Sequence, residues 1–187
     1  CSEYTEQYLN LMRETDDQLK KLLSHYRKQK EPTMVIFFGD HQGKLSSWFY
    51  EYKLYGKDPD TRTLEELEQM YVTLFLVWTN YDSPSAKDVM LSTNFLSALT
   101  AKCSNLPTTP YQDFLCRLSR ELPVVQTMGL VNRAGMLTED EEELTAEQQA
   151  LLRDYETLCF YNLFGSKKHR LPEVDQSFFA PQTSAAP

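Results

Sequence analysis

Asp40 and His41 are the residues whose types and position could do chemistry, since they stand side by side directly after a run of apolar residues. A carboxylate supplies a hard oxygen and an imidazole a borderline nitrogen, so the two side chains can aim at one divalent cation. Gly39 and Gly43 flank the pair and let the backbone approach closely. A held ion needs at least three protein ligands, and no third lies nearby in the sequence. The alternative is an Asp40 that caps a turn and a His41 that packs.

The elements around this pair predict an α/β sheet. Residues 33–38 are continuously apolar rather than alternating, which predicts a strand covered on both faces in a parallel sheet. Residues 72–78 predict a second strand of the same kind. An amphipathic helix over about Thr5–Gln29 precedes the first strand, and a capping box at Thr63 opens a short helix before the second. In such sheets, ligands gather beyond the carboxyl ends of the strands, where Asp40 and His41 would lie.

The second half of the chain reads as mainly helical. In order, the sequence predicts a helix after Ser92 or Thr93, a capped helix from Thr109 to Pro123, a short hairpin over 124–138, a solvated acidic loop over 139–143, and a capped helix from Thr145 to near Gly165. We expect residues 1–165 to form the globular part. Residues 166–187 should be a tail that is disordered in part.

Composition excludes several functions. The 187 residues carry 19 Lys and Arg against 27 Asp and Glu, and this net charge of -8 has the wrong sign for a general nucleic-acid binder. No stretch approaches the roughly 20 apolar residues of a membrane span, so we expect a soluble, globular chain. The four cysteines lack CxxC spacing and read as isolated thiols. No G-x-S-x-G, P-loop or G-x-G-x-x-G motif occurs, and His25 and His169 are weak ligand candidates.

With these residues in view, the segment 35–42 (Val-Ile-Phe-Phe-Gly-Asp-His-Gln) resembles the late metal-binding segment of the alkaline phosphatase superfamily, in the branch of sulfatases and lipoteichoic acid synthases. Pattern-level likeness to the C-terminal part of lipoteichoic-acid-synthase-like proteins of Gram-positive bacteria extends from about Tyr4 to Gly165. It is carried by residues 49–51, 75–78, 91–96, 110–115 and 155–165. The fold that this resemblance implies is the C-terminal portion of an alkaline-phosphatase-like (sulfatase) α/β sheet with flanking helices.

The resemblance also implies a mechanism and a location. The parent protein would be membrane-anchored, with an extracellular catalytic domain that holds a divalent metal, typically manganese, with zinc, calcium or magnesium as alternatives. Asp40 and His41 would be the last two metal ligands, beside an early glutamate and a threonine nucleophile. The family attacks a phosphodiester through that threonine and forms a covalent intermediate, which an acceptor hydroxyl or water resolves. The substrate would be a glycerol-phosphate lipid or polymer at the cell surface.

Neither the glutamate nor the nucleophile has a match in this chain. We therefore expect the chain to be part of a longer protein, to need a missing upstream half as its partner, and to be inactive alone. Two other enzyme classes stay open, a sulfatase and a phosphoethanolamine-type transferase, because they share the Asp-His segment. A non-catalytic interaction module is the alternative from another class. A surface exposed by truncation could also let the chain dimerise.

Overall fold

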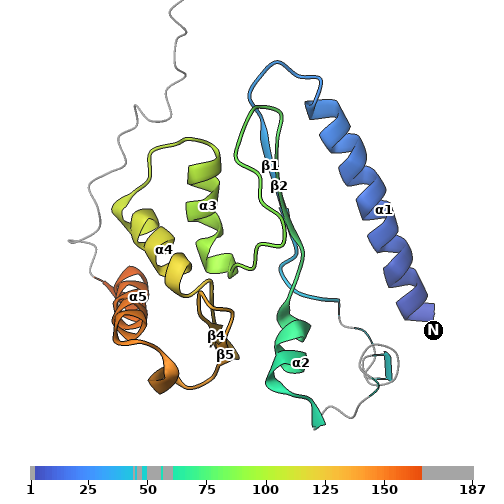
Figure 1. The fold of residues 1–187 in the computed structure, drawn as a ribbon. Coiled ribbons are helices and arrows are strands. Elements are labelled where there is room, and N and C mark those ends of the chain that lie inside the picture. Colours follow the sequence, from blue (N-terminus) through green and yellow to red (C-terminus); the bar gives the residue numbers. More distant parts are fainter. Residues whose placement is uncertain (1–2, 44, 46–47, 50–55, 57–60, 166–187) are drawn as a thin grey trace, which may run out of the picture. The chain divides into compact units, whose positions relative to one another are not determined.

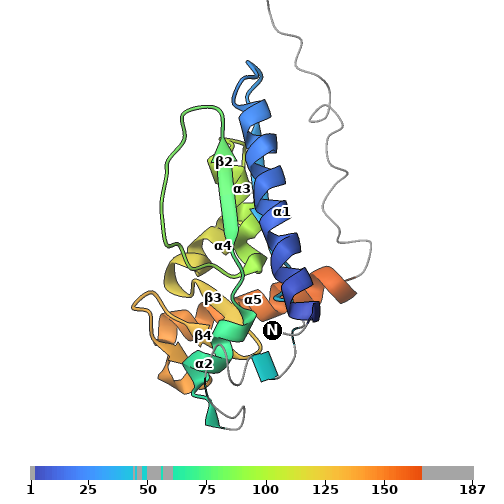
Figure 2. The ribbon, with the colours of Figure 1, turned by 90° about the vertical axis from the view of Figure 1, so that its right-hand side faces the viewer.

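The computed structural model describes residues 3–43, 45, 48–49, 56 and 61–165. The chain divides into two compact units, Cys1–Leu144 and Thr145–Pro187. The first unit holds every strand found among the described residues, in two small sheets with helices beside them, and is therefore of the expected α/β class. Figures 1 and 2 show these elements from two directions. The predicted tail over 166–187 lies outside the described residues.

The strand that precedes Asp40 pairs with its neighbour in the opposite direction from the one predicted. Strand β1 (Met34–Phe38) pairs with β2 (Phe75–Thr79) in an antiparallel register that sets Met34 opposite Thr79 and Phe38 opposite Phe75. The strands are half-buried rather than fully covered, and Phe38 is 46% exposed. The prediction of two buried parallel strands was wrong, because an apolar run fixes neither the direction of the partner strand nor whether other elements cover both faces.

Helix α1 (Glu3–Tyr26) is joined to the β1–β2 pair through the side chain of Asn80. Asn80 Nδ2 donates to three carbonyl oxygens after and at the helix end, those of Tyr26 at 3.1 Å, Gln29 at 3.2 Å and Glu31 at 2.9 Å. Its Oδ1 accepts from the Thr33 amide at 2.7 Å, and its own amide donates to the Thr33 carbonyl at 3.1 Å. One side chain thus joins the last carbonyl of the helix and two carbonyls of the segment after it to the residue before β1.

The connection from β1 to β2 contains helix α2 (Leu64–Glu68) and the 3₁₀ turn η3 (Gln69–Tyr71). The predicted capping box is present: Thr63 Oγ1 accepts from the Glu66 amide at 3.3 Å, and the Glu66 carboxylate accepts from the Thr63 amide at 2.9 Å. Residues 72–74, which were predicted to belong to the strand, connect η3 to β2 instead. They lie next to the end of β1.

The buried core of the first unit lies in the part that follows β2. It comprises the turn η4 (Thr93–Phe95), helices α3 (Leu96–Cys103) and α4 (Pro110–Glu121), and a three-stranded antiparallel sheet of β3 (Val124–Gln126), β4 (Gly129–Val131) and β5 (Leu137–Thr138). Figure 2 shows the long connection from β2 to this part. The fully buried residues here are Phe95, Ala98, Leu115, Leu118 and Leu122. The capping box at Thr109 and the hairpin over 124–138 are confirmed, the hairpin with one strand more than predicted.

In the second unit, the described residues form helix α5 (Ala146–Phe164), which begins with the predicted capping box at Thr145 and ends at Gly165. The acidic run before it forms the short turn η5 (Glu141–Glu143). Among the described residues, no helix combines the length and the apolar character needed to cross a membrane. Cys103, Cys116 and Cys159 are free and half-buried, in line with the prediction of isolated thiols.

Replacing Asn80 by Asp should destabilise the protein. The new carboxylate can still accept from the Thr33 amide, but its second oxygen would face three carbonyl oxygens and can donate to none of them. We expect the free energy of unfolding to fall by about 2–3 kcal/mol, measured by chemical denaturation. Asn10→Asp, an exposed site on α1 with the same charge change, is the control and should stay within about 0.5 kcal/mol of wild type. Equal losses in the two variants would contradict the role of Asn80.

Candidate functional site

The loop that carries Asp40 and His41 begins at Gly39, which is held against the segment preceding β2. The Gly39 amide donates to the Leu74 carbonyl at 3.1 Å, and Thr73 Oγ1 donates to the Gly39 carbonyl at 2.9 Å. A Cβ at position 39 would lie 3.0 Å from Thr73 Cβ, closer than carbon atoms pack without displacement. Glycine therefore lets the loop lie close against the Thr73 side chain, which a larger residue at position 39 would have to displace by a few tenths of an ångström.

The loop ends at Gln42 and Gly43, which are held by two other elements. Gln42 Nε2 donates to the Gln69 carbonyl at 2.9 Å and to the Val72 carbonyl at 2.8 Å, and so ties the loop to η3. Gly43 lies against the ring of Tyr8 on α1, where an added Cβ would come within 2.8 Å of the Tyr8 hydroxyl oxygen. The loop is thus fixed on both sides of the Asp-His pair.

Between these anchors the two side chains extend into solvent, Asp40 with 83% and His41 with 78% of the side chain exposed. Asp40 Oδ1 accepts from the His41 amide at 2.9 Å, which is the turn-capping bond of the alternative interpretation. The His41 ring does not pack, contrary to the second half of that alternative. Asp40 Oδ2 and His41 Nε2 lie 3.6 Å apart.

The hydrogen bond at the other ring nitrogen defines which atom of His41 can bind a cation. His41 Nδ1 lies 2.9 Å from the Gln42 carbonyl oxygen. A carbonyl oxygen only accepts, so Nδ1 carries the proton and the lone pair of the neutral ring is on Nε2. The nitrogen that faces Asp40 Oδ2 is therefore the one able to act as a ligand, and a carbonyl on the far nitrogen is the usual support of a metal-binding histidine.

These donors fit a divalent cation. Two ligands about 2.1 Å from a tetrahedral ion lie ~3.4 Å from one another, close to the observed separation of Oδ2 and Nε2. One carboxylate oxygen with one imidazole nitrogen suits manganese or zinc better than calcium or magnesium, which prefer oxygen alone. Within the described ranges, no group of three or more His, Cys, Asp or Glu side chains is placed to hold a metal ion. The described chain thus offers two ligands.

Because β1 and β2 are antiparallel, Asp40 and His41 are positioned by other residues than the sequence predicted. The sequence placed Asp40 and His41 beyond the shared carboxyl ends of parallel strands. In the structure, the carboxyl end of β1 meets the amino end of β2, so the groups that position the loop come from residues 69–74 ahead of β2. The pair still follows the strand directly, as predicted.

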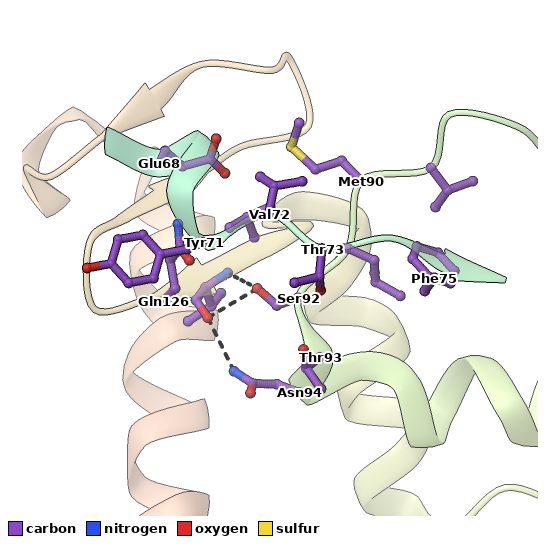
Figure 3. A pocket seen from close by; sticks show the side chains of 14 residues that line it. Glu68, Tyr71, Val72, Thr73, Phe75, Met90, Ser92, Thr93, Asn94 and Gln126 are labelled. Carbon is purple, nitrogen blue, oxygen red and sulfur yellow. Dashed lines mark hydrogen bonds between the residues drawn. The ribbon is translucent and has the colours of Figure 1, made fainter. Parts of the chain in front are cut away.

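A second feature is a cavity of about 210 Å³ bounded by α2, η3, the start of β2, residues 89–94 and β3. Figure 3 shows several polar side chains that line it. Ser92 Oγ accepts from the Val125 amide at 2.8 Å and donates to the Val125 carbonyl at 3.2 Å, and Asn94 Nδ2 donates to the same carbonyl at 3.2 Å. These groups satisfy one another.

Two other polar groups in this cavity have no hydrogen-bond partner among the described residues, and only the Gln126 amide nitrogen is also closed off from solvent. Gln126 Nε2 is buried and has no hydrogen-bond partner in the described structure. Glu68 is only 8% exposed, and no hydrogen bond or ion pair reaches its carboxylate from the described residues. Burial raises the pKa of the Glu68 carboxyl above its ordinary value of 4.5, because desolvation disfavours the charged form.

Several of these residues had no role in the sequence-based prediction. Gln42 belongs to the Asp-His segment, but the sequence analysis assigned it no function. Its side chain binds carbonyls 27 and 30 positions away, and no pattern in the neighbouring sequence indicates such bonds. Glu68 did leave one, since it lies four residues after Leu64 and three before Tyr71, on the apolar stripe of the predicted helix. A carboxylate on such a stripe predicts a buried acid. His25 is exposed on α1, and His169 lies outside the described residues.

Comparison with known proteins gives three likenesses. A family model described as Sulfatase matches residues 2–103, a range that includes Asp40 and His41. The putative cyclic beta-1,2-glucan modification protein of Rhizobium meliloti (strain 1021) is 26% identical over 163 residues, covering 86% of this chain and 25% of that protein. The solved Streptococcus pyogenes phosphoglycerol transferase GacH, in complex with sn-glycerol-1-phosphate, superposes with a TM-score of 0.56 at 17% identity, covering 78% of this chain and 31% of that one.

The chain therefore spans about a quarter of the curated relative and about a third of the solved structure. At 17% identity, the likeness to the transferase concerns the fold. It confirms the fold class expected from sequence, an α/β arrangement of the alkaline-phosphatase-like, sulfatase type.

Gln42→Leu should loosen the loop that carries Asp40 and His41. The variant removes both bonds to the η3 segment, so the Val72 carbonyl loses the donor from Gln42 and the Gln69 carbonyl keeps only the Val72 amide. We expect a loss of about 1–2 kcal/mol in the free energy of unfolding and faster amide hydrogen exchange in residues 39–43. Gln69→Leu, on an exposed side chain, is the matched control. Unchanged exchange in the Gln42 variant would show that these bonds do not hold the loop.

Glu68→Gln should stabilise the protein in a pH-dependent way. The raised pKa of Glu68 means that folding favours the protonated acid, so its contribution is fully present below pH 4.5 and is lost as the pH rises through the folded-state value. The variant should therefore unfold at a higher temperature than wild type at neutral pH and match it in acid. Thermal melts at both pH values measure this. Exposed Glu139→Gln should show no such difference, and a Glu68→Gln gain of equal size in acid would refute the burial argument.

Proposed function

Because the chain belongs to the sulfatase family, we propose that it contributes the metal ligands Asp40 and His41 to the catalytic domain of a metal-dependent phosphotransferase or hydrolase. The observation that carries the proposal is the 3.6 Å separation of Asp40 Oδ2 and His41 Nε2, on a loop fixed at both ends. The resemblance noted from the sequence is to this same family. The matched range contains the pair.

The proposed ion is manganese, the metal typical of the family that the sequence resembles, and zinc is the alternative that the separation of Asp40 Oδ2 and His41 Nε2 fits as a tetrahedral ion. When bound, such an ion lowers the pKa of a nucleophile and offsets negative charge on the group being transferred. The residues of this chain hold and orient the ligands. Gln42 supports the proposed arrangement in two ways, through its carbonyl, which fixes the proton on His41 Nδ1, and through its side chain, which anchors the loop.

The proposed reaction is transfer or hydrolysis of a glycerol-phosphate group carried by a lipid or polymer outside the cell. Its support lies in the names of the two relatives, one a phosphoglycerol transferase and the other a putative glucan modification protein. Together these names favour a phosphoglycerol donor and a carbohydrate hydroxyl as acceptor. The alternative is hydrolysis of a sulfate ester, which the family description favours.

The proposal includes a division of labour within a larger protein. This chain spans only part of its relatives, and none of its residues matches the family's nucleophile or early glutamate. We expect those groups from other residues of the full-length enzyme, with a threonine nucleophile in a transferase and a C-x-P-x-R motif in a sulfatase. The chain by itself should not turn over a phosphodiester.

The test is manganese binding and activity of the full-length enzyme with Asp40→Ala and His41→Ala. Each variant removes one direct ligand, so both should lower manganese affinity and phosphodiester turnover by more than about 100-fold. Calorimetry measures the first quantity, and release of glycerol phosphate from a lipid donor measures the second.

Asp82→Ala and His25→Ala are the matched controls. Asp82 is an exposed aspartate in the loop after the other strand of the same sheet, and His25 is an exposed histidine on α1. Both controls should behave like wild type. Retained manganese affinity in Asp40→Ala and His41→Ala would refute the metal-ligand assignment. Turnover of sulfate esters in place of phosphodiesters would favour the alternative function.

A further inference from the structure

We propose that the cavity beside η3 is a binding site for a neutral polyhydroxyl ligand of the size of a single sugar ring. The site includes neither Asp40 nor His41, and the proposal does not depend on the function assigned to them. Its lining residues come from α2, η3, the start of β2, residues 89–94 and β3, all within the first unit.

The first argument is one buried donor without a partner and one carboxyl group in the same cavity that no described residue binds. Most polar side chains in folded proteins that lose contact with water gain a hydrogen bond, and a buried group without one costs about 1–3 kcal/mol. Gln126 Nε2 is such a donor. The Glu68 carboxyl adds an acceptor in the same cavity, on an element of its own (Figure 3). A ligand hydroxyl can both accept from the amide and donate to the carboxyl, so hydroxyl groups satisfy the two together.

The second argument is charge. Among the described lining residues there is no Lys, Arg or His, and Glu68 is the one ionisable acid. A phosphate or sulfate would enter without a cationic partner and beside a carboxyl group, which opposes its binding. A cationic ligand would meet a single carboxyl whose burial already disfavours its charged form. A neutral ligand avoids both costs.

The third argument is size and the nature of the walls. A cavity of about 210 Å³ holds roughly seven water molecules and lies below the ~300 Å³ at which sites for drug-sized ligands begin. One ring fits this space better than an oligosaccharide. Tyr71 and Met90 are more than half exposed and give the cavity apolar surface beside its polar groups. Sugar rings have the matching combination, an apolar C–H face with hydroxyl groups at the edge.

The proposal is tested with glucose and glycerol as neutral probes and inorganic phosphate and sulfate as anionic ones, by saturation-transfer NMR on the full-length protein. Glucose should receive saturation and the anions should not displace it. Gln126→Leu and Glu68→Leu each remove one hydrogen-bonding group that faces the ligand, so each should weaken glucose binding about tenfold.

The controls make the same changes on exposed side chains. Gln69→Leu, next to Glu68 in sequence, and Glu139→Leu should bind glucose like wild type. Should Glu68→Leu fail to fold in a circular dichroism melt, Glu68→Gln keeps the shape of the side chain and should weaken binding about fivefold. The proposal is overturned by absence of saturation transfer to both neutral probes, by displacement of glucose by phosphate, or by unchanged affinity in Gln126→Leu.

Discussion

The hydrogen bonds of Asn80 are the constraint on which the first half of the fold depends. A 24-residue helix with one buried residue, Thr5, has few apolar contacts to fix its direction. Asn80 provides the missing restraint, because its amide joins the last carbonyl of α1 and two carbonyls of the following turn to the strand pair. The same side chain holds Thr33, one residue before β1 begins. The start of β1 is therefore defined by polar bonds and not by apolar burial.

The opposite end of β1 and the loop after it are held by a different kind of interaction, the close contact of two glycines with neighbouring side chains. Gly39 lies against Thr73, where a side chain would be tightly packed, and Gly43 lies against the ring of Tyr8, where a side chain has no room. The sequence indicated only that these glycines permit a close approach. The structure identifies what approaches, and it explains how two largely exposed side chains are carried on a loop that is itself anchored.

Local chemistry could be predicted from the sequence, and long-range pairing could not. The capping boxes at Thr63, Thr109 and Thr145 are confirmed because each involves residues three apart, whose contact follows from helix geometry alone. The direction of β1 against β2 was wrong because it depends on how a connection of more than thirty residues returns. For the same reason the bonds of Gln42 to η3 and of Asn80 to α1 were not foreseen. Asp40 and His41 stay a prediction as metal ligands, while their family context is confirmed.

The contact between Tyr8 and Gly43 depends on the length of helix α1. Tyr8 and Tyr26 are 18 positions apart on one helix, which corresponds to about 27 Å along its axis. Asn80 binds the Tyr26 carbonyl at the C-terminal end of the helix, and Gly43 contacts the Tyr8 ring near its N-terminal end. Deleting one residue between them would turn Tyr8 by about 100° around the helix and draw it back by about 1.5 Å. The length of helix α1 therefore sets the distance between these two contacts. Homologous chains that keep the contact between Tyr8 and Gly43 should accept substitutions along α1 far more readily than insertions or deletions in it.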